Sequence, residues 1–315
     1  MQGLVIKNTG SSYAVLSDNG TTQECYIKGN FRIKGIRSTN PVAVGDYVSV
    51  EALPDGTHWI TDIEDRRNYI VRRSTNLSKE THILAANLDR VALLITLQHP
   101  VTSTVFIDRF LATAEAYCVP AVLLFNKTDL LDEEGLSELA RLTALYEGLG
   151  YPTYSIAAKL MDREQADNLL HAVFAGRTTL LSGNSGVGKS TLLNALFGTE
   201  MTRTGIISSA HDKGMHTTTF SQMYPLPADK VGQNGWLIDT PGIKGFGAVQ
   251  MAKEEVSHYF REIFRIGQEC RYSNCLHTGE PGCAVQPAVV RGEIAVSRFE
   301  SYLSLLGDCE ESKYR

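Results

Sequence analysis

The strongest constraint on the fold of this chain is a glycine-rich run between an apolar strand-like segment, 178–182, and an apolar helix-like segment that begins at Thr191. The run reads Gly183-Asn184-Ser185-Gly186-Val187-Gly188-Lys189-Ser190. A strand, loop and helix of this kind direct backbone N–H groups and the positive end of the helix at phosphate oxygens. We expect Lys189 to reach the β- and γ-phosphates of a nucleotide and Ser190 to bind Mg²⁺. By average residue usage the pattern arises by chance in a chain of this size on the order of 1% of the time.

A second motif indicates which base the nucleotide carries. Asn126-Lys127-Thr128-Asp129 follows the apolar segment 119–125, and open α/β sheets bind ligands at such strand ends. The Asp129 carboxylate can accept hydrogen bonds from N1–H and the exocyclic amine of guanine, while Asn126 and Lys127 frame the base. Adenine lacks that donor pattern, and a site built on such pairs rejects the analogue by several powers of ten. The sequence therefore predicts a guanine nucleotide.

A third segment matches the loop that contacts guanine O6 through its backbone. Ser155-Ile156-Ala157 ends the next strand-like segment, and we expect Ser155 and Ala157 to belong to the base site. The match is short, and a simple turn remains the alternative.

A fourth motif is expected to contribute a second group that binds Mg²⁺. Asp239-Thr240-Pro241-Gly242 follows the apolar segment 236–238, so Asp239 is expected to hold Mg²⁺ through water and Gly242 to sense the γ-phosphate. The polar loop 214–219 lies where a first switch region belongs, and Thr218 is the threonine that we expect to bind Mg²⁺ in the GTP state.

The order of these motifs is rearranged. Ordinary small GTPases begin with the phosphate loop and end with the base-recognition motifs, whereas here the base motifs come first. The chain is therefore predicted to be a circular permutant. Its second switch region leads directly into the C-terminal part, which provides a route by which the nucleotide state can be transmitted.

The residue that positions the attacking water is not the usual one. Ile243 follows Gly242, where Ras-like enzymes carry a glutamine, and an aliphatic side chain cannot hold water. His216, with a neutral imidazole as acceptor, is the candidate. The alternative is that His216 only packs against or solvates its loop, and that a partner supplies the group.

Local patterns of strand, helix and turn residues divide the 315 residues into three predicted domains. Residues 1–67 contain five short β-rich runs separated by turn signals, which favours a small β-barrel of the OB or SH3 type. A basic linker follows the barrel, with Arg66, Arg67, Arg72 and Arg73. Residues 68–250 then contain strands alternating with helices, which is typical of a mostly parallel sheet. Residues 251–315 have helical patterns on both sides of a cysteine cluster. No apolar run reaches about 18 residues and no secretory signal is visible, so we expect a cytoplasmic protein that does not enter membranes.

The cysteine cluster predicts a metal site. Cys270, Cys275 and Cys283 group around His277, and in a reducing compartment that grouping favours metal binding over disulfides. Three thiols and one imidazole suit a closed, tetrahedral, structural Zn²⁺ site with no position left for water. Three unrelated buried cysteines are the alternative.

Taken together, these motifs resemble the RsgA family, the bacterial GTPases that depend on the small ribosomal subunit. The resemblance covers essentially the whole chain, from Val44-Gly45-Asp46 to the Cys/His cluster, and implies an N-terminal OB domain, a permuted GTPase domain and a C-terminal zinc domain. It also implies binding to the 30S subunit and its 16S rRNA, late subunit maturation, and GTP hydrolysis to GDP and phosphate that the subunit stimulates. One departure is Met215, where the family usually has an arginine.

The resemblance also changes the interpretation of a basic stretch near the N-terminus. Lys28, Arg32, Lys34 and Arg37 occur with Tyr26 and Phe31 interleaved, a composition suited to RNA backbone and base stacking. Taken alone, such a run is more often a solvated loop. In an OB-type barrel of this family it is expected to bind RNA.

Two other functions fit parts of the sequence. An RNA-binding checkpoint protein would use GTP as a conformational clamp with negligible turnover, which the missing glutamine favours. A factor of the large subunit is the third possibility, although the barrel and the Cys/His cluster argue against it. We expect a monomer. At the phosphate-loop position where K⁺-dependent GTPases often carry an asparagine, this chain has Gly186.

Overall fold

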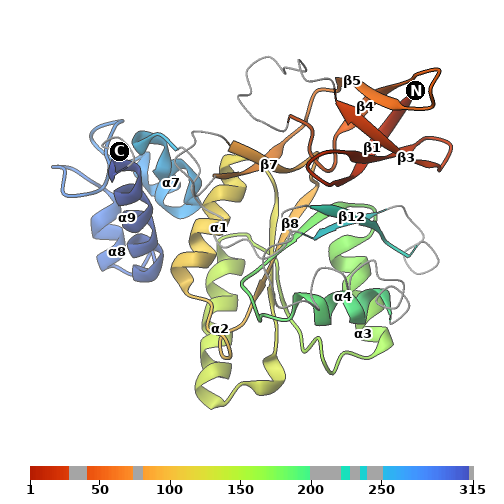
Figure 1. The fold of residues 1–315 in the computed structure, drawn as a ribbon. Coiled ribbons are helices and arrows are strands. Elements are labelled where there is room, and N and C mark those ends of the chain that lie inside the picture. Colours follow the sequence, from red (N-terminus) through yellow and green to blue (C-terminus); the bar gives the residue numbers. More distant parts are fainter. Residues whose placement is uncertain (28–40, 74–80, 199–220, 228–234, 240–250, 312–315) are drawn as a thin grey trace.

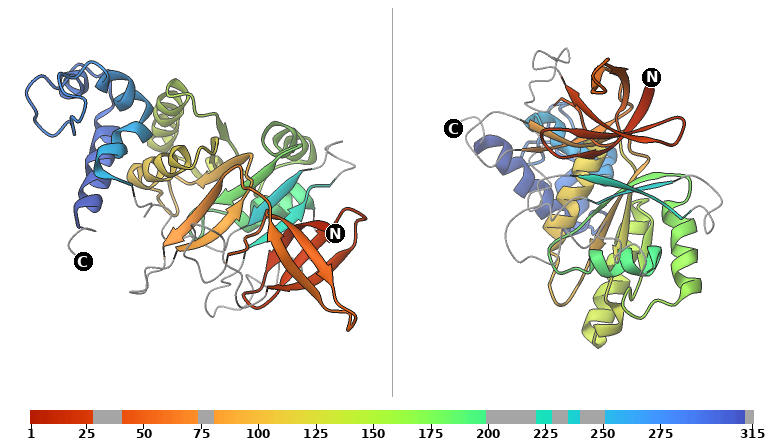
Figure 2. Two further views of the ribbon diagram at one scale, coloured as in Figure 1. Left: turned by 90° about the horizontal axis from the view of Figure 1, so that it is seen from above. Right: turned by 45° about the vertical axis from the view of Figure 1, so that its right-hand side comes forward.

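The computed structural model describes residues 1–27, 41–73, 81–198, 221–227, 235–239 and 251–311. They form an N-terminal barrel, a central sheet with helices on both faces, and a C-terminal group of helices (Figure 1). The barrel and the C-terminal helices lie on opposite sides of the central part, as the view from above in Figure 2 shows. The fold class predicted from the sequence is confirmed. Within the described ranges, no helix has both the length and the apolar content needed to cross a membrane.

The barrel consists of the five predicted strands. They are β1 (Gln2–Asn8), β2 (Tyr13–Ser17), β3 (Thr22–Ile27), β4 (Tyr47–Ala52) and β5 (His58–Ile63). They pair in the order β1-β2-β3-β5-β4, and β4 also pairs with β1, which closes the barrel. β3 and β5 run parallel and the other pairs antiparallel. Residues alternate between inside and outside, so Val5, Val15 and Ile60 meet in the core.

The segment after the barrel is a β-hairpin, and the prediction of a basic linker is wrong there. β6 (Tyr69–Arg73) pairs antiparallel with β7 (Thr81–Ala86). Arg66, just before the hairpin, is buried: its guanidinium donates to both carboxylate oxygens of Asp46 at 2.7 and 2.6 Å. The arginine therefore ties the hairpin to the barrel instead of facing solvent.

Among the described residues, the central sheet has six strands in the order β10-β9-β8-β11-β13-β12. They are β8 (Arg90–Ile95), β9 (Ala121–Phe125), β10 (Thr153–Ser155), β11 (Thr178–Ser182), β12 (Gln222–Pro225) and β13 (Trp236–Asp239). Neighbours are parallel except β12, which runs antiparallel to β13. The strand before the phosphate loop, β11, lies inside the sheet although it is the fourth of these strands along the chain, as expected of a permuted GTPase. Lys7 of β1 pairs with Gln222 of β12 and joins the barrel to this sheet.

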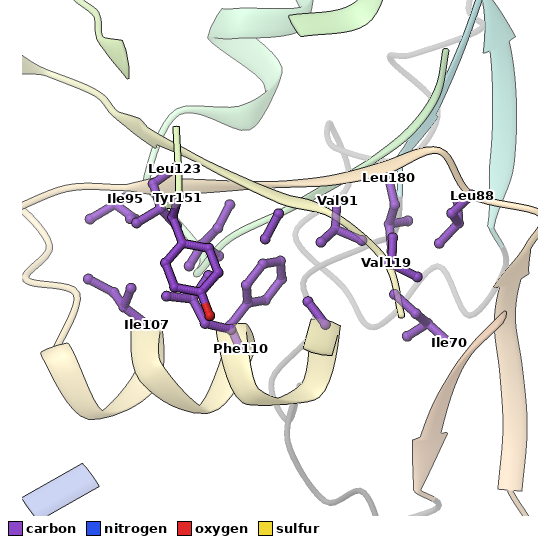
Figure 3. Close-up of a cluster of buried hydrophobic side chains, with 14 of the residues drawn as sticks. Ile70, Leu88, Val91, Ile95, Ile107, Phe110, Val119, Leu123, Tyr151 and Leu180 are labelled. Carbon is purple, nitrogen blue, oxygen red and sulfur yellow. The ribbon is translucent and has the colours of Figure 1, made fainter. Parts of the chain in front are cut away.

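Helices cover both faces of the central sheet. One face carries α1 (Thr104–Ala116) and α2 (Glu133–Gly148), and the other carries α3 (Arg163–Leu169), the π-helical turn η2 (Leu170–Phe174) and α4 (Lys189–Phe197). Figure 3 shows Ile107 and Phe110 of α1 packed against sheet residues that include Leu123. Phe110 is fully buried, and burial of such a side chain contributes about 1.5–3 kcal/mol to stability.

The C-terminal part is helical on both sides of the cysteine cluster, as predicted. Its elements are the 3-10 helix η4 (Lys253–Tyr259), α7 (Arg261–Gly267), α8 (Val285–Val290) and α9 (Val296–Glu311). Their apolar side chains form a separate core that also includes Ala112 of α1. Helix α1 therefore packs against the sheet with one face and against the C-terminal helices with another.

Candidate functional site

The phosphate loop connects β11 to α4 at the carboxyl end of the sheet. Gly183 and Gly188 have φ angles of 152° and 99°, in the region that favours glycine. Each also lacks room for a side chain, because a Cβ would lie 2.6 Å from the Leu94 carbonyl oxygen at Gly183 and 2.5 Å from Asn126 Nδ2 at Gly188. The glycines therefore let the loop fold tightly against neighbouring strand ends, which leaves its N–H groups available to an anion.

Lys189 points back into this loop. It is the first residue of α4 and is 8% exposed, and its ammonium donates to the carbonyl oxygens of Gly183 at 2.6 Å and Asn184 at 3.0 Å. Burial lowers the pKa of Lys189, while the nearby Asp239 carboxylate opposes that shift. An ammonium that donates to neutral carbonyls can exchange them for phosphate oxygens, which offer stronger, charge-assisted hydrogen bonds.

Asn126 joins three of the predicted motifs. It follows β9 and is 4% exposed. Its amide Nδ2 donates to the carbonyl of Val187 in the phosphate loop at 2.8 Å, and its Oδ1 accepts from the N–H of Ala158 at 3.0 Å. One side chain thus holds the phosphate loop beside the segment that contains Ser155 and Ala157.

Lys127 makes a further connection at the same edge. Its backbone is left-handed, with φ 62°, and its ammonium donates to the carbonyl oxygens of Gly186 at 2.8 Å and His99 at 2.6 Å. His99 belongs to the turn after β8. The aliphatic stem of Lys127 therefore spans the space between the phosphate loop and the base motif.

The predicted base-reading groups face solvent beside these anchors. Asp129 lies in the 3-10 turn η1 (Thr128–Leu130) and is exposed, and among the described residues no group pairs with its carboxylate. Thr128 fastens the turn, since its hydroxyl donates to the Ile156 carbonyl at 3.1 Å. Ser155 is exposed at the end of β10. An available carboxylate at a fixed place can pair with a ligand that presents two adjacent donors.

Asp239 ends β13 next to the phosphate loop. It lies opposite Leu181 of β11 in the parallel pairing of these strands. Burial of Tyr224, together with the nearby negative charge of Asp239, raises the pKa of Tyr224 to about 12. Ser190 is in the first turn of α4, just after the phosphate loop that follows β11, and Asp239 ends the adjacent strand β13. Their hydroxyl and carboxylate oxygens suit a magnesium ion.

Several predicted residues lie outside the described ranges. They are Met215, His216, Thr218 and Gly242 of the switch segments, and Lys28, Arg32, Lys34 and Arg37 of the barrel. In the described part of the barrel, the rings of Tyr26 and Trp59 lie 6.1 Å apart, a pair that no local pattern in the sequence predicted.

The four predicted metal ligands come together in the C-terminal part. Their ligand atoms, from Cys270, Cys275, His277 and Cys283, all lie within 4.8 Å of one another. Nδ1 of His277 is 3.6 Å from the sulfur atoms of both Cys270 and Cys283. Burial lowers the pKa of His277 and raises the pKa of Cys275 to about 12. The imidazole is therefore neutral and ready to bind, whereas the thiols must release protons when they bind a metal ion.

Glu280 supports this cluster and was not identified from the sequence. Its carboxylate accepts hydrogen bonds from the N–H groups of Leu276 at 2.9 Å, Thr278 at 2.8 Å and Gly279 at 3.1 Å. Burial disfavours the charged carboxylate, but these bonds prevail and lower the pKa of Glu280 to about 2. The side chain thus fixes the turn that carries His277. Its position in the sequence between Cys275 and Cys283 could have indicated this role, because residues that hydrogen-bond to a metal-binding turn commonly lie close to the ligands.

The chain matches known proteins over its whole length. Residues 2–60 match the family model described as RsgA N-terminal domain, and residues 63–249 match RsgA GTPase. A relative from Bacteroides fragilis, strain YCH46, named "Small ribosomal subunit biogenesis GTPase RsgA", is 58% identical over 315 residues, covering 100% of this chain and 99% of the relative.

Solved structures agree with this assignment. The structure described as YjeQ from Thermotoga maritima has a TM-score of 0.73 and 32% identity, covering 98% of each chain. The structure described as YloQ, a circularly permuted GTPase, has a TM-score of 0.70 and 26% identity, covering 100% of this chain and 96% of that chain. With its motifs gathered at one edge of a permuted sheet, the chain belongs to the RsgA family of GTPases.

Proposed function

We propose that this protein binds GTP at the carboxyl edge of the central sheet and hydrolyses it to GDP and phosphate on the small ribosomal subunit, during late maturation of that subunit. The observation that carries the proposal is the position of Asn126, which bonds to Val187 and Ala158 and so holds phosphate and base motifs together. The name of the Bacteroides relative, a small-subunit biogenesis GTPase, supports the choice of partner.

In this proposal each motif has one task. Lys189 leaves the carbonyl oxygens of Gly183 and Asn184 and donates to the β- and γ-phosphates, which the loop N–H groups also bind. Asp129 accepts from guanine, with Asn126, Lys127, Ser155 and Ala157 around the base. Ser190, Thr218 and Asp239 would hold Mg²⁺, which when bound neutralises charge on the phosphates. Gly242 senses the γ-phosphate, and His216 orients the attacking water.

The C-terminal cluster is proposed to be a structural zinc site. Three cysteines and His277 would supply four ligands, the number that a structural zinc ion takes, which would leave no position for a reacting water. We also propose the domain division 1–67, 68–250 and 251–315, with a monomeric protein acting in the cytoplasm.

The barrel is proposed to contact 16S rRNA. The basic residues Lys28, Arg32, Lys34 and Arg37 would bind the phosphate backbone, and Tyr26, which is 36% exposed beside Trp59, would stack on a base. Charge and an exposed aromatic ring on one small barrel support this interaction.

GTP turnover measured with and without purified 30S subunits tests the proposal, with 50S subunits as the control particle. Partner-supplied groups raise GTPase rates by about 10³–10⁵. We expect strong stimulation by 30S alone and its loss in His216→Ala. Tight GTP binding without stimulation by either particle would contradict the coupled enzyme and favour the conformational clamp. Stimulation by 50S alone would favour the large subunit.

A further inference from the structure

A cluster of charged side chains is buried where the C-terminal helices meet the central part. Arg298 of α9 is 1% exposed, and its guanidinium donates to both carboxylate oxygens of Glu262 on α7, at 2.6 and 3.1 Å. It also donates to Asp108 Oδ1 on α1 at 2.9 Å, and the hydroxyl of Tyr146 on α2 donates to the same oxygen at 2.9 Å. These four residues, here called the Arg298 cluster, connect two helices of the GTPase part with two of the C-terminal part.

The cluster links these helices strongly because its charges have no access to water. One guanidinium faces two carboxylates, and the second oxygen of Asp108, Oδ2, is buried without a hydrogen-bond partner among the described residues. The two carboxylates outweigh the effect of burial and raise the pKa of Arg298. Moving Asp108 away from Arg298 would leave a buried carboxylate uncompensated, which is strongly unfavourable. Helices α1 and α9 are therefore constrained to move together.

The N-terminus of α1, little more than one helical turn before Asp108, lies beside the nucleotide site. Ser103 caps the helix by accepting from the N–H of Phe106 at 3.3 Å. The turn just before it contains His99, whose carbonyl accepts from Lys127 at 2.6 Å. The turn is held internally, since the Thr96 hydroxyl donates to the Pro100 carbonyl at 2.6 Å. A displacement of Lys127 is thus passed to the first turn of α1.

From these contacts we infer that α1 and the Arg298 cluster couple the nucleotide site to the C-terminal helices, which makes Asp108 and Arg298 positioning residues for the GTPase reaction. This inference rests on the proposed nucleotide site. It adds a route through packed helices to the covalent route that the permuted order provides. A nucleotide that contacts Lys127 and the phosphate loop restricts the motion of the turn before α1. Through the Arg298 cluster, the motion of α9 is restricted as well. Because linkage is reciprocal, the cluster in turn raises the affinity for nucleotide.

The test compares two carboxylate-to-amide substitutions on the same helix in the full-length protein. Asp108→Asn weakens the link to Arg298 but keeps the Arg298–Glu262 pair and the side-chain shape. The matched control is Glu115→Gln, whose carboxylate accepts from Arg261 at 2.8 Å at the exposed edge of the same interface. For each protein, hydrogen exchange of residues 296–311 is measured with and without GDP, and the Kd for GDP is titrated separately.

In the wild-type protein and in Glu115→Gln, GDP should slow exchange in α9 by about fivefold or more. In Asp108→Asn that difference should disappear, and by reciprocity the Kd for GDP should rise by a similar factor. If Asp108→Asn does not fold, Tyr146→Phe removes only one hydroxyl from the cluster and should change both quantities in the same direction.

Three results would overturn the inference, in distinguishable ways. Wild-type protein that binds GDP without any change in α9 exchange would refute the coupling and leave the nucleotide site intact. Wild-type protein that does not bind GDP would refute the proposed function and the coupling with it. An unchanged nucleotide response in Asp108→Asn would show that the cluster carries no coupling.

Discussion

Asn126→Ala is expected to lower the free energy of unfolding of the GDP-bound protein by about 2–3 kcal/mol. The side chain is 4% exposed and makes two hydrogen bonds to backbone groups, at 2.8 Å to Val187 and at 3.0 Å to Ala158. Each such bond contributes about 1 kcal/mol, and leaving its partner unsatisfied in a buried place adds to the loss. Two bonds therefore give the stated total.

The loss of about 2–3 kcal/mol can appear in two measurable quantities, the stability of the nucleotide-free protein and the affinity for GDP. If the phosphate loop and residues 156–158 stay in place without nucleotide, the loss reduces the stability of the nucleotide-free protein. If they separate, GDP must bring them together again, and its affinity falls by up to about 30- to 140-fold, at tenfold per 1.4 kcal/mol. The two losses should sum to about 2–3 kcal/mol in either case.

The assay uses the two tryptophans of the chain. In a Trp59→Phe background, fluorescence of Trp236 on β13 follows urea unfolding of the central sheet, and a GDP titration gives the Kd. Asn168→Ala, at an exposed position of α3, is the control and should change each quantity by less than about 0.5 kcal/mol. A summed loss for Asn126→Ala as small as that of the control would refute the reasoning.

Three further predictions concern the metal cluster and the core. Glu280→Gln should weaken metal binding by about tenfold in a chelator competition, because an amide accepts the three N–H bonds less strongly than a carboxylate does. The control Glu293→Gln, whose partner Arg291 is exposed, should have no effect on metal binding. The affinity for Zn²⁺ should rise with pH between 6 and 8, because burial raises the pKa of Cys275 to about 12 and binding must displace its proton; an affinity independent of pH would contradict this. Phe110→Ala should cost about 3–5 kcal/mol in urea unfolding, and a loss under 1 kcal/mol would mean that α1 is not anchored to the sheet.

Local patterns were sufficient to predict most of the fold. The apolar segment before Gly183 and the helical spacing after Lys189 are periodicities within one element, so they locate β11 and α4 directly. The order of the motifs along the chain, combined with their strand ends, then predicted the permuted sheet. Each motif by itself is contained in a short run of consecutive residues.

Contacts between distant residues could not be predicted in this way. Arg66 lies among other arginines, and its contacts with Asp46 and with the Pro41 carbonyl, both about 20 or more residues earlier, make it a buried anchor. Arg298 and Asp108 belong to different domains of the prediction, and neither has a local pattern that separates it from a surface charge. Pairing across the tertiary structure leaves no periodic trace in a single sequence.

The base-recognition motif showed the same limit within the site. Asn126 and Asp129 belong to one predicted base motif, but the structure gives their side chains different surroundings. Asn126 is 4% exposed and bonded to Val187 and Ala158, while Asp129 is exposed. The four-residue string indicates the ligand, whereas the structure separates a residue that holds the loops from one that is available to the base.

The central claim is that these motifs form one guanine-nucleotide site, and the most direct measurement is the affinity for GDP, ADP and XDP in the wild-type protein and in Asp129→Asn. A carboxylate that reads two donors of guanine should favour GDP over ADP by at least about 10⁴-fold in the wild-type protein. The variant should lose GDP and gain XDP, because the amide of asparagine can donate to the carbonyl that xanthine carries in place of the guanine amine. Equal affinity of the wild-type protein for GDP and ADP, or unchanged GDP binding by Asp129→Asn, would contradict the account.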